Sequence, residues 1–163
     1  VGSEMCIRDR YNNFMKKCTL ALGCFWKPEE NFKNKLGIIE TEVGYAGGKN
    51  PTVTYKEVCV GDTGHAEVVR LTFDEKIISF KKILDLFFKM HDPTQKDMQF
   101  PDIGTQYRSE IFFVDEEQKT IAINVRDKFN KLLDNKVVTN INPLTEFFRA
   151  EEYHQKYIEK NRK

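Results

Sequence analysis

Two stretches of alternating side chains restrict the fold of this chain more than any other feature. From Ile38 to Tyr45 the side chains alternate, with Ile39, Thr41, Val43 and Tyr45 on one side, and Ala66 to Asp74 alternates in the same way. Alternation with a period of two is typical of strands in an antiparallel sheet. Strong turn residues, Gly47-Gly48-Lys49-Asn50-Pro51, separate the two stretches. We therefore expect two sheet strands joined by a loop that runs through Tyr55 and Cys59 to Gly61-Asp62.

Further elements are expected on both sides of this strand pair. Cys18 to Leu22 reads as a buried strand followed by a helix, and Ser79 as the cap of a helix that ends near His91. The remaining expected elements are a strand at Ser109–Val114, a helix capped by Asp115 with Ile121, Val125, Phe129 and Leu132 on one stripe, a short Val137-Val138 segment and a helix around Glu151–Lys160. This order predicts an α+β fold, a two-layer ferredoxin-like sandwich with a mainly antiparallel sheet, helices packed on it and C-terminal additions.

The length of the chain fits one ordinary globular domain, and its charge restricts its partners. Its 163 residues carry a formal net charge of +1, so nucleic acid and anionic membranes are not expected partners. No apolar run is long enough to cross a membrane, and no signal-peptide pattern is present. We expect a cytoplasmic monomer. Val1 to Arg10 resembles a translated sequencing adapter, so residues 1–14 are expected to be a non-native or disordered leader and 15–163 a single domain.

The cysteines are few and irregularly spaced. If Cys6 belongs to the leader, Cys18, Cys24 and Cys59 remain. They match neither a disulfide framework nor a zinc pattern, which predicts a reducing compartment and neither a metal nor another cofactor.

Gly23-Cys24-Phe25-Trp26 places one of these thiols beside the only tryptophan, at a strand-to-helix junction. Backbone N–H groups at a helix N-terminus lower the pKa of a thiol and favour the reactive anion. Cys24 is therefore a candidate nucleophile. The alternative is that Cys24 is a small buried core residue.

Glu67 is a candidate acid, because alternation puts its carboxyl group on the same strand face as Val69, Leu71 and Phe73. A carboxylate on an apolar face is expected to have a raised pKa and, once neutral, can donate a proton. The alternative is a solvated or salt-bridged Glu67.

Other polar side chains near these segments are weaker candidates for site residues. Tyr45, Tyr55 and Tyr107 are flanked by turn residues, where a phenol can donate to a site, although packing is their usual role. Asp102 can order water or cap a turn. His65, His91 and His154 lack metal-ligand spacing and are expected to be hydrogen-bonded structural residues.

Together these residues resemble the A-type peptide-methionine sulfoxide reductases, from Met15 to about Ile158. The segments that carry the resemblance are Gly23–Trp26, Gly44–Gly48, Tyr55–Cys59, Gly61–Glu67, His91–Thr94 with Asp102–Ser109, and, more weakly, Ala150–Gln155. The resemblance implies reduction of the S epimer of methionine sulfoxide, free or in proteins, with thioredoxin or a small thiol as reductant.

The same resemblance implies a role for each site residue. Cys24 attacks the sulfoxide sulfur and becomes a sulfenic acid, while Phe25 and Trp26 hold the substrate methyl group. Glu67 protonates the sulfoxide oxygen. Tyr55 and Tyr107 hydrogen-bond that oxygen, and Asp102 orders the polar side of the site.

Two departures from the family pattern leave alternatives open. Many members carry a resolving cysteine in a C-terminal tail, which the sequence up to Lys163 lacks. Either the sequence is truncated, or the sulfenic acid is resolved by Cys18, by Cys59 or by an external thiol. Met98-Gln99-Phe100-Pro101 stands where the family usually has a basic residue and a glycine, and Phe100 is expected to narrow or reshape the rim of the site. The rival readings are a general thiol oxidoreductase and a non-catalytic ferredoxin-like binding module.

Overall fold

The computed structural model describes residues 15–49, 54–61 and 63–161. The expected leader 1–14, with Cys6, lies outside the described residues. So do part of the glycine-rich turn, at Asn50-Pro51, and Asp62.

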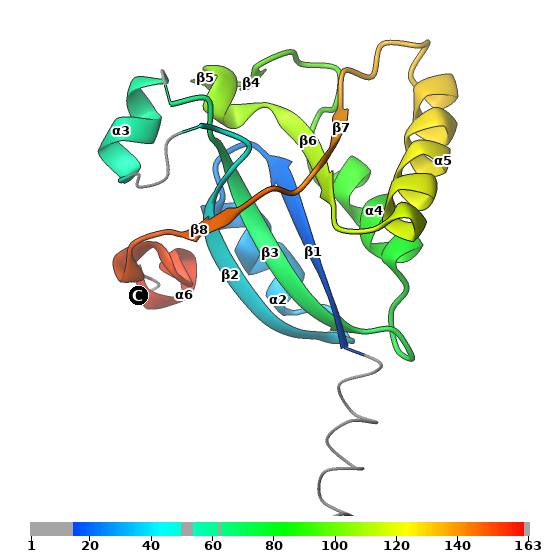
Figure 1. Ribbon diagram of the computed structural model, residues 1–163, viewed down its shortest axis with the longest axis horizontal. Coiled ribbons are helices and arrows are strands. Elements are labelled where there is room, and N and C mark those ends of the chain that lie inside the picture. Colours follow the sequence, from blue (N-terminus) through cyan, green and yellow to red (C-terminus); the bar gives the residue numbers. More distant parts are fainter. Residues whose placement is uncertain (1–14, 50–53, 62, 162–163) are drawn as a thin grey trace, which may run out of the picture.

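A curled sheet of six strands forms the centre of the described part of the chain (Figure 1). Its spatial order is β7 (Asn140–Pro143), β6 (Ser109–Phe113), β1 (Met15–Leu22), β3 (Ala66–Asp74), β2 (Ile38–Ala46) and β8 (Phe147–Arg149). Neighbouring strands are antiparallel except β6 and β7, which are parallel. The prediction of an α+β fold with a mainly antiparallel sheet is confirmed.

Helices cover one face of this sheet, and a C-terminal segment crosses the other. The α-helices are α2 (Trp26–Lys33), α3 (Tyr55–Val60), α4 (Phe80–Met90), α5 (Glu116–Leu132) and α6 (Tyr157–Asn161). Apolar residues of α2, α4 and α5 share one large core with β1, β2 and β3. Leu144 and Phe147 pack on a smaller cluster, and Figure 1 shows their segment passing in front of the sheet with α2 behind it. None of the described helices is long and apolar enough to cross a membrane.

The expected helix caps are confirmed. Ser79 Oγ accepts a hydrogen bond from the N–H of Lys82 at 3.1 Å, and α4 follows directly. Asp115 Oδ1 accepts from the N–H of Gln118 at 2.8 Å at the start of α5. Each cap satisfies a backbone donor that a helix leaves unpaired in its first turn.

The structure corrects the two predicted side-chain stripes. Ile39 is half exposed instead of sharing the buried side of β2, because the register against β3 shifts between Ile38 and Glu40. Leu132 is exposed at the last turn of α5, whose buried residues include Ala122 and Phe129.

Other corrections concern segments expected to be loops or single elements. The loop after β2 contains α3, for which Thr54 supplies the cap. The loop from Asp92 to Gln106 contains a small hairpin of β4 (Met98–Gln99) and β5 (Asp102–Ile103), and the 3-10 helix η1 (Thr105–Tyr107) follows it. At Val137-Val138 the backbone N–H groups bond Asn130 and Pro93, so the strand forms later as β7.

The expected C-terminal helix is divided into two short pieces. They are the 3-10 helix η2 (Glu152–His154) and α6, and Lys156, at φ 52°, separates them. A left-handed residue interrupts the helical path, and the N–H of Lys156 instead donates a hydrogen bond to Glu29 in α2.

Candidate active site

Cys24 lies at a sharp turn between β1 and α2. Gly23 makes this turn with φ 98°, a left-handed conformation that side chains other than glycine rarely adopt. A Cβ at Gly23 would also lie 2.9 Å from the side chain of Gln99. The β4–β5 hairpin therefore packs directly against the residue before the thiol, and a larger residue at 23 would displace one of the two.

The thiol of Cys24 is protonated in the resting protein. Burial, followed by the nearby charge of Glu67, raises its pKa to about 12, while the backbone N–H of Trp26 acts in the opposite direction. The predicted contact between a backbone N–H at the helix N-terminus and the thiol is thus present. The expectation of a lowered pKa is nevertheless wrong, because the loss of solvation outweighs one N–H group.

Glu67 is buried beside Cys24, with 1% of its surface exposed. Its Oε1 accepts a hydrogen bond from the N–H of Phe25 at 3.3 Å. Burial raises the pKa of Glu67 to about 8, so the carboxyl group is neutral at pH 7, as the sequence predicted. Because Oε1 accepts this bond and Oε2 has no hydrogen-bond partner among the described residues, we assign the proton of the neutral carboxyl group to Oε2.

Three further predicted residues converge on these two groups. Tyr55 begins α3, Tyr107 ends η1 and Asp102 lies in β5. Burial, and next the charge of Glu67, raises the pKa of Tyr107. Burial and a hydrogen bond to the Cys59 thiol raise the pKa of Tyr55, so both phenols remain donors. The charge of Asp102 raises the pKa of Cys24 and of Glu67, which places its carboxylate within reach of both.

The two aromatic residues after Cys24 occupy different depths. Phe25 is 1% exposed, and its ring packs against those of Tyr45 and Tyr55. Trp26 is half-buried, with its indole stacked on the ring of Tyr157. Trp26 therefore provides the more exposed aromatic surface at this junction, whereas Phe25 lies in the core.

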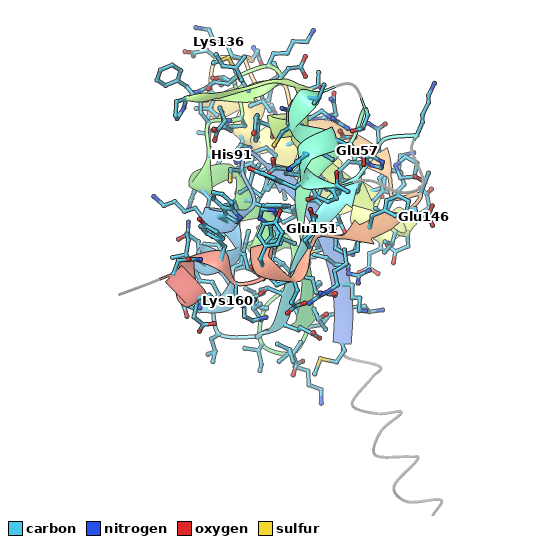
Figure 2. The ribbon with its side chains drawn as sticks, turned by 90° about the vertical axis from the view of Figure 1, so that its left-hand side faces the viewer. Glu57, His91, Lys136, Glu146, Glu151 and Lys160 are labelled. Carbon is cyan, nitrogen blue, oxygen red and sulfur yellow. The ribbon has the colours of Figure 1, made fainter. Side chains whose placement is uncertain are left out.

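A C-terminal segment, Glu151–Tyr157, completes the site and was missed as a source of functional residues. The Glu151 carboxylate accepts from the Tyr45 hydroxyl at 2.9 Å and from the N–H of Tyr55 at 3.0 Å. In Figure 2, Glu151 lies between α3, where Glu57 is labelled, and the final helix, where Lys160 is labelled. The matching segment Ala150–Gln155 was the one signal in the sequence that pointed here.

The remaining candidates serve the fold or lie at the edge of this cluster. Cys18 is buried in β1, whereas Cys59 is exposed on α3. His91 bonds the carbonyl of Phe87 and the hydroxyl of Ser109, each at 2.7 Å. His65 Nδ1 accepts from the N–H of Gly48. Both agree with the expected structural role of the histidines.

This arrangement can protonate one atom of a bound molecule while a thiol attacks the atom next to it. A carboxyl group with a raised pKa, two phenol donors and a half-buried thiol lie close enough for their charges to influence one another. Donors of this kind stabilise negative charge that develops on an oxygen during attack. The half-buried indole beside them suits a small apolar group attached to the same molecule.

Comparisons with known proteins agree with this chemistry. A family model described as peptide methionine sulfoxide reductase matches residues 16–163. The peptide methionine sulfoxide reductase MsrA of Pelagibacter ubique is 56% identical over 146 residues, which cover 90% of this chain and 99% of that protein. The crystal structure of reduced Mxr1 from Saccharomyces cerevisiae matches with a TM-score of 0.88 and 39% identity, over 91% of this chain and 87% of that one. Mxr1 in complex with Trx2 matches with a TM-score of 0.65 and 26% identity, over 89% and 86%.

Proposed function

The chain belongs to the peptide methionine sulfoxide reductase family, and we propose that it reduces the S epimer of methionine sulfoxide to methionine with Cys24 as the nucleophile. One observation carries the assignment of the chemistry. Glu67 is buried, its pKa is raised to about 8, its charge acts on the Cys24 thiol, and its Oε2 has no hydrogen-bond partner among the described residues. Sulfoxide sulfur is a poor electrophile until its oxygen is protonated, so a neutral acid is the group that this reaction needs.

The proton on Glu67 Oε2 goes to the sulfoxide oxygen as the Cys24 sulfur bonds the sulfoxide sulfur. Cys24 gives up its own proton in this step, which returns Glu67 to its neutral form. The sulfur–oxygen bond of the substrate and the new sulfur–sulfur bond then break, a bond forms between the hydroxyl oxygen and the Cys24 sulfur, and methionine leaves with the electron pair of the sulfur–sulfur bond. The thiol is oxidised to a sulfenic acid by two electrons, and the sulfoxide is reduced by two. The protein gains no net charge, in keeping with a buried site.

Tyr55 and Tyr107 donate hydrogen bonds to the sulfoxide oxygen, because their raised pKa values keep both phenols protonated at neutral pH. Asp102, on the β4–β5 hairpin, orders the polar side of the site. Phe25 and Trp26 hold the methyl group of the substrate, with the half-buried indole of Trp26 as the more exposed of the two surfaces. These roles rest on the position of each residue around the thiol.

Thioredoxin, or a small dithiol in its place, returns Cys24 to a thiol. Two thiol groups of the reductant become a disulfide, and the sulfenic oxygen leaves as water. The solved complex of yeast Mxr1 with Trx2 supports this choice of partner. Cys59 is the better internal candidate for a resolving thiol, because it is exposed and its charge influences Cys24, whereas Cys18 is buried in the core.

We also propose that residues 15–163 act as one cytoplasmic monomeric domain with a ferredoxin-like two-layer core. The spatial order β6, β1, β3, β2 and the shared core of α2 and α4 support that core. The sparse, unpaired cysteines support a reducing compartment. A non-catalytic binding module is not favoured, since it would gain nothing from a buried neutral carboxyl group beside a thiol.

The test is turnover of the two epimers of a methionine sulfoxide peptide with dithiothreitol as reductant. Methionine is expected from the S epimer, with the R epimer left unchanged. Equal rates on both epimers, or no product from either, would refute the proposal. Cys24→Ser should abolish the reaction, while Cys18→Ala serves as the matched cysteine control because its side chain lies away from the site in β1.

A further inference from the structure

The two phenols of the site come from different elements, so their spacing depends on how those elements are held together. Tyr55 begins α3 and Tyr107 ends η1. The charge of Tyr107 contributes to the raised pKa of Tyr55, so the two side chains lie close to each other. Figure 1 shows α3 at the edge of the molecule. Contacts with neighbouring segments therefore decide where Tyr55 lies relative to Tyr107.

Gln106 connects the two elements. It precedes Tyr107 in η1, and its Nε2 donates a hydrogen bond to the carbonyl of Cys59 in α3 at 3.1 Å. At the other end of α3, the N–H of Tyr55 donates to the Glu151 carboxylate at 3.0 Å. The helix is thus held at both ends, and the bond from Gln106 fixes its distance from η1.

The surroundings of Gln106 are fitted to its amide group. The residue is 4% exposed. A Cβ at Gly104 would lie 2.8 Å from the Cδ and 2.9 Å from the Nε2 of Gln106, which is too close for a real side chain. A Cβ at Gly61, just after α3, would lie 3.4 Å from Oε1. Glycines from two separate turns therefore leave the space that the amide occupies.

Packing alone does not account for a glutamine at this point. Its Oε1 is buried and has no hydrogen-bond partner among the described residues. An unpaired buried acceptor lowers stability, and an apolar side chain of similar length would avoid this cost. The feature of Gln106 that an apolar residue lacks is the donor that reaches Cys59.

We propose that Gln106 is a positioning residue that sets the separation of the Tyr55 and Tyr107 hydroxyl groups, so that both donate to one sulfoxide oxygen. This inference rests on the role proposed above for the two tyrosines. Negative charge on that oxygen grows as the Cys24 sulfur attacks, so misaligned donors cost more in the transition state than in the bound substrate. Loss of Gln106 therefore slows the chemical step more than it weakens binding.

The experiment compares two buried glutamines in the full chain. Gln106→Met keeps a side chain of similar length but removes the donor. Gln118→Met is the matched control, since Gln118 in α5 is 6% exposed and donates to the carbonyl of Lys17 at 2.9 Å. Single-turnover rates are measured against methionine sulfoxide concentration.

We expect Gln106→Met to lower the limiting rate about 10- to 100-fold, with the half-saturating concentration within about threefold of the wild type. Gln118→Met should change either quantity by no more than about twofold. Equal losses of rate in the two variants, or a change confined to the half-saturating concentration, would overturn the proposal.

A double-mutant comparison shows whether Gln106 acts through the phenol on α3. Arg108 holds η1 by donating to the carbonyls of Thr105 and Gly64 at 2.9 and 3.0 Å, so loss of Gln106 moves α3 and leaves η1 in place. In a Tyr55→Phe background the displaced hydroxyl group is absent. Adding Gln106→Met there should lower the limiting rate by less than about threefold. An undiminished further fall would contradict the proposal.

Hydrogen exchange tests the attachment of α3 without any measurement of activity. The amides of Tyr55–Val60 should exchange at least about fivefold faster in Gln106→Met than in the wild type, while those of α5 stay unchanged. Equal exchange of α3 in the two proteins would refute the proposal. If Gln106→Met does not fold, Gln106→Asn, whose amide is too short to reach Cys59, replaces it in every comparison. If the wild type forms no methionine, the function assigned to the site fails, while exchange still decides whether Gln106 holds α3.

Discussion

The N–H of Phe25 donates to Glu67 Oε1 at 3.3 Å and leaves Oε2 without a partner among the described residues. This bond joins the residue after the nucleophile to the acid on the neighbouring strand β3. It favours the proton on Oε2, because the carbonyl oxygen of a protonated carboxyl group is a better hydrogen-bond acceptor than its hydroxyl oxygen. The acid is thus oriented before a substrate arrives, which is the condition for efficient proton transfer.

Replacement of this acid should slow the first chemical step. Glu67→Gln keeps the size of the side chain and the acceptor for Phe25 but offers no acidic proton. We expect the single-turnover rate to fall about 100- to 1,000-fold, with circular dichroism unchanged. Glu117→Gln, on the exposed first turn of α5, is the matched control. An unchanged rate in Glu67→Gln would remove Glu67 from the acid role.

The raised pKa of Glu67 should also make the free energy of unfolding depend on pH. Its pKa is about 8 in the folded protein against an ordinary value of 4.5. Between these two pH values Glu67 is ionised in the unfolded chain but neutral in the folded protein. The free energy of unfolding therefore falls as pH rises, and the fall levels off above pH 8.

Glu67→Gln does not titrate at this position. Its free energy of unfolding relative to the wild type should therefore increase from about pH 5 to about pH 8.5, by on the order of 3 to 5 kcal/mol. Urea unfolding at the two pH values measures the difference. A difference that stays constant with pH would mean that Glu67 titrates normally in the fold.

The turn before the nucleophile should tolerate no side chain. Gly23→Ala combines a left-handed backbone with a Cβ placed 2.9 Å from Gln99. Gly64→Ala is the control, since Gly64 has φ 77° but only an ordinary 3.5 Å contact. Both should lose about 1–2 kcal/mol of unfolding free energy from the backbone conformation. Only Gly23→Ala should also reduce single-turnover activity, by moving the hairpin that carries Asp102. Equal activity losses would contradict this reading.

The buried Cys18 should take no part in recycling. Burial raises the pKa of its thiol, and it lies within the core between β1 and β3. After one turnover without reductant, mass spectrometry should find Cys18 reduced, and Cys18→Ala should leave turnover with thioredoxin unchanged. Oxidation of Cys18 in the folded protein would show that Cys18 does take part in recycling and would contradict this prediction. The same spectra show whether Cys59 is consumed together with Cys24.

Much of the sheet could be predicted because its signals are local. The alternation from Ala66 to Asp74 defined β3 and placed Glu67 on an apolar face, and the caps at Ser79 and Asp115 are contained in four-residue patterns. The helix α3 was missed because its cap, Thr54, stands amid strong turn residues. The exposed Ile39 was missed because a register shift depends on the partner strand.

The features that escaped prediction depend on contacts between distant parts of the chain. The bond from Trp26 to His154 spans 128 residues, and the one from Val43 to Gln155 spans 112. No periodicity indicates such partners. The pKa of Cys24 was predicted in the wrong direction for the same reason, since the helix terminus is visible in the sequence and the burial that outweighs it is not.

The central claim is that Cys24 receives the oxygen of the sulfoxide. The most direct test is one turnover of the wild type with an S-sulfoxide peptide carrying ¹⁸O and without reductant, followed by dimedone trapping and by mass spectrometry of the peptide that contains Cys24. We predict one methionine per protein molecule, label transferred to Cys24 in the untrapped sample and a dimedone adduct on that residue alone. Methionine formed with Cys24 unmodified, or no methionine at all, would contradict the account.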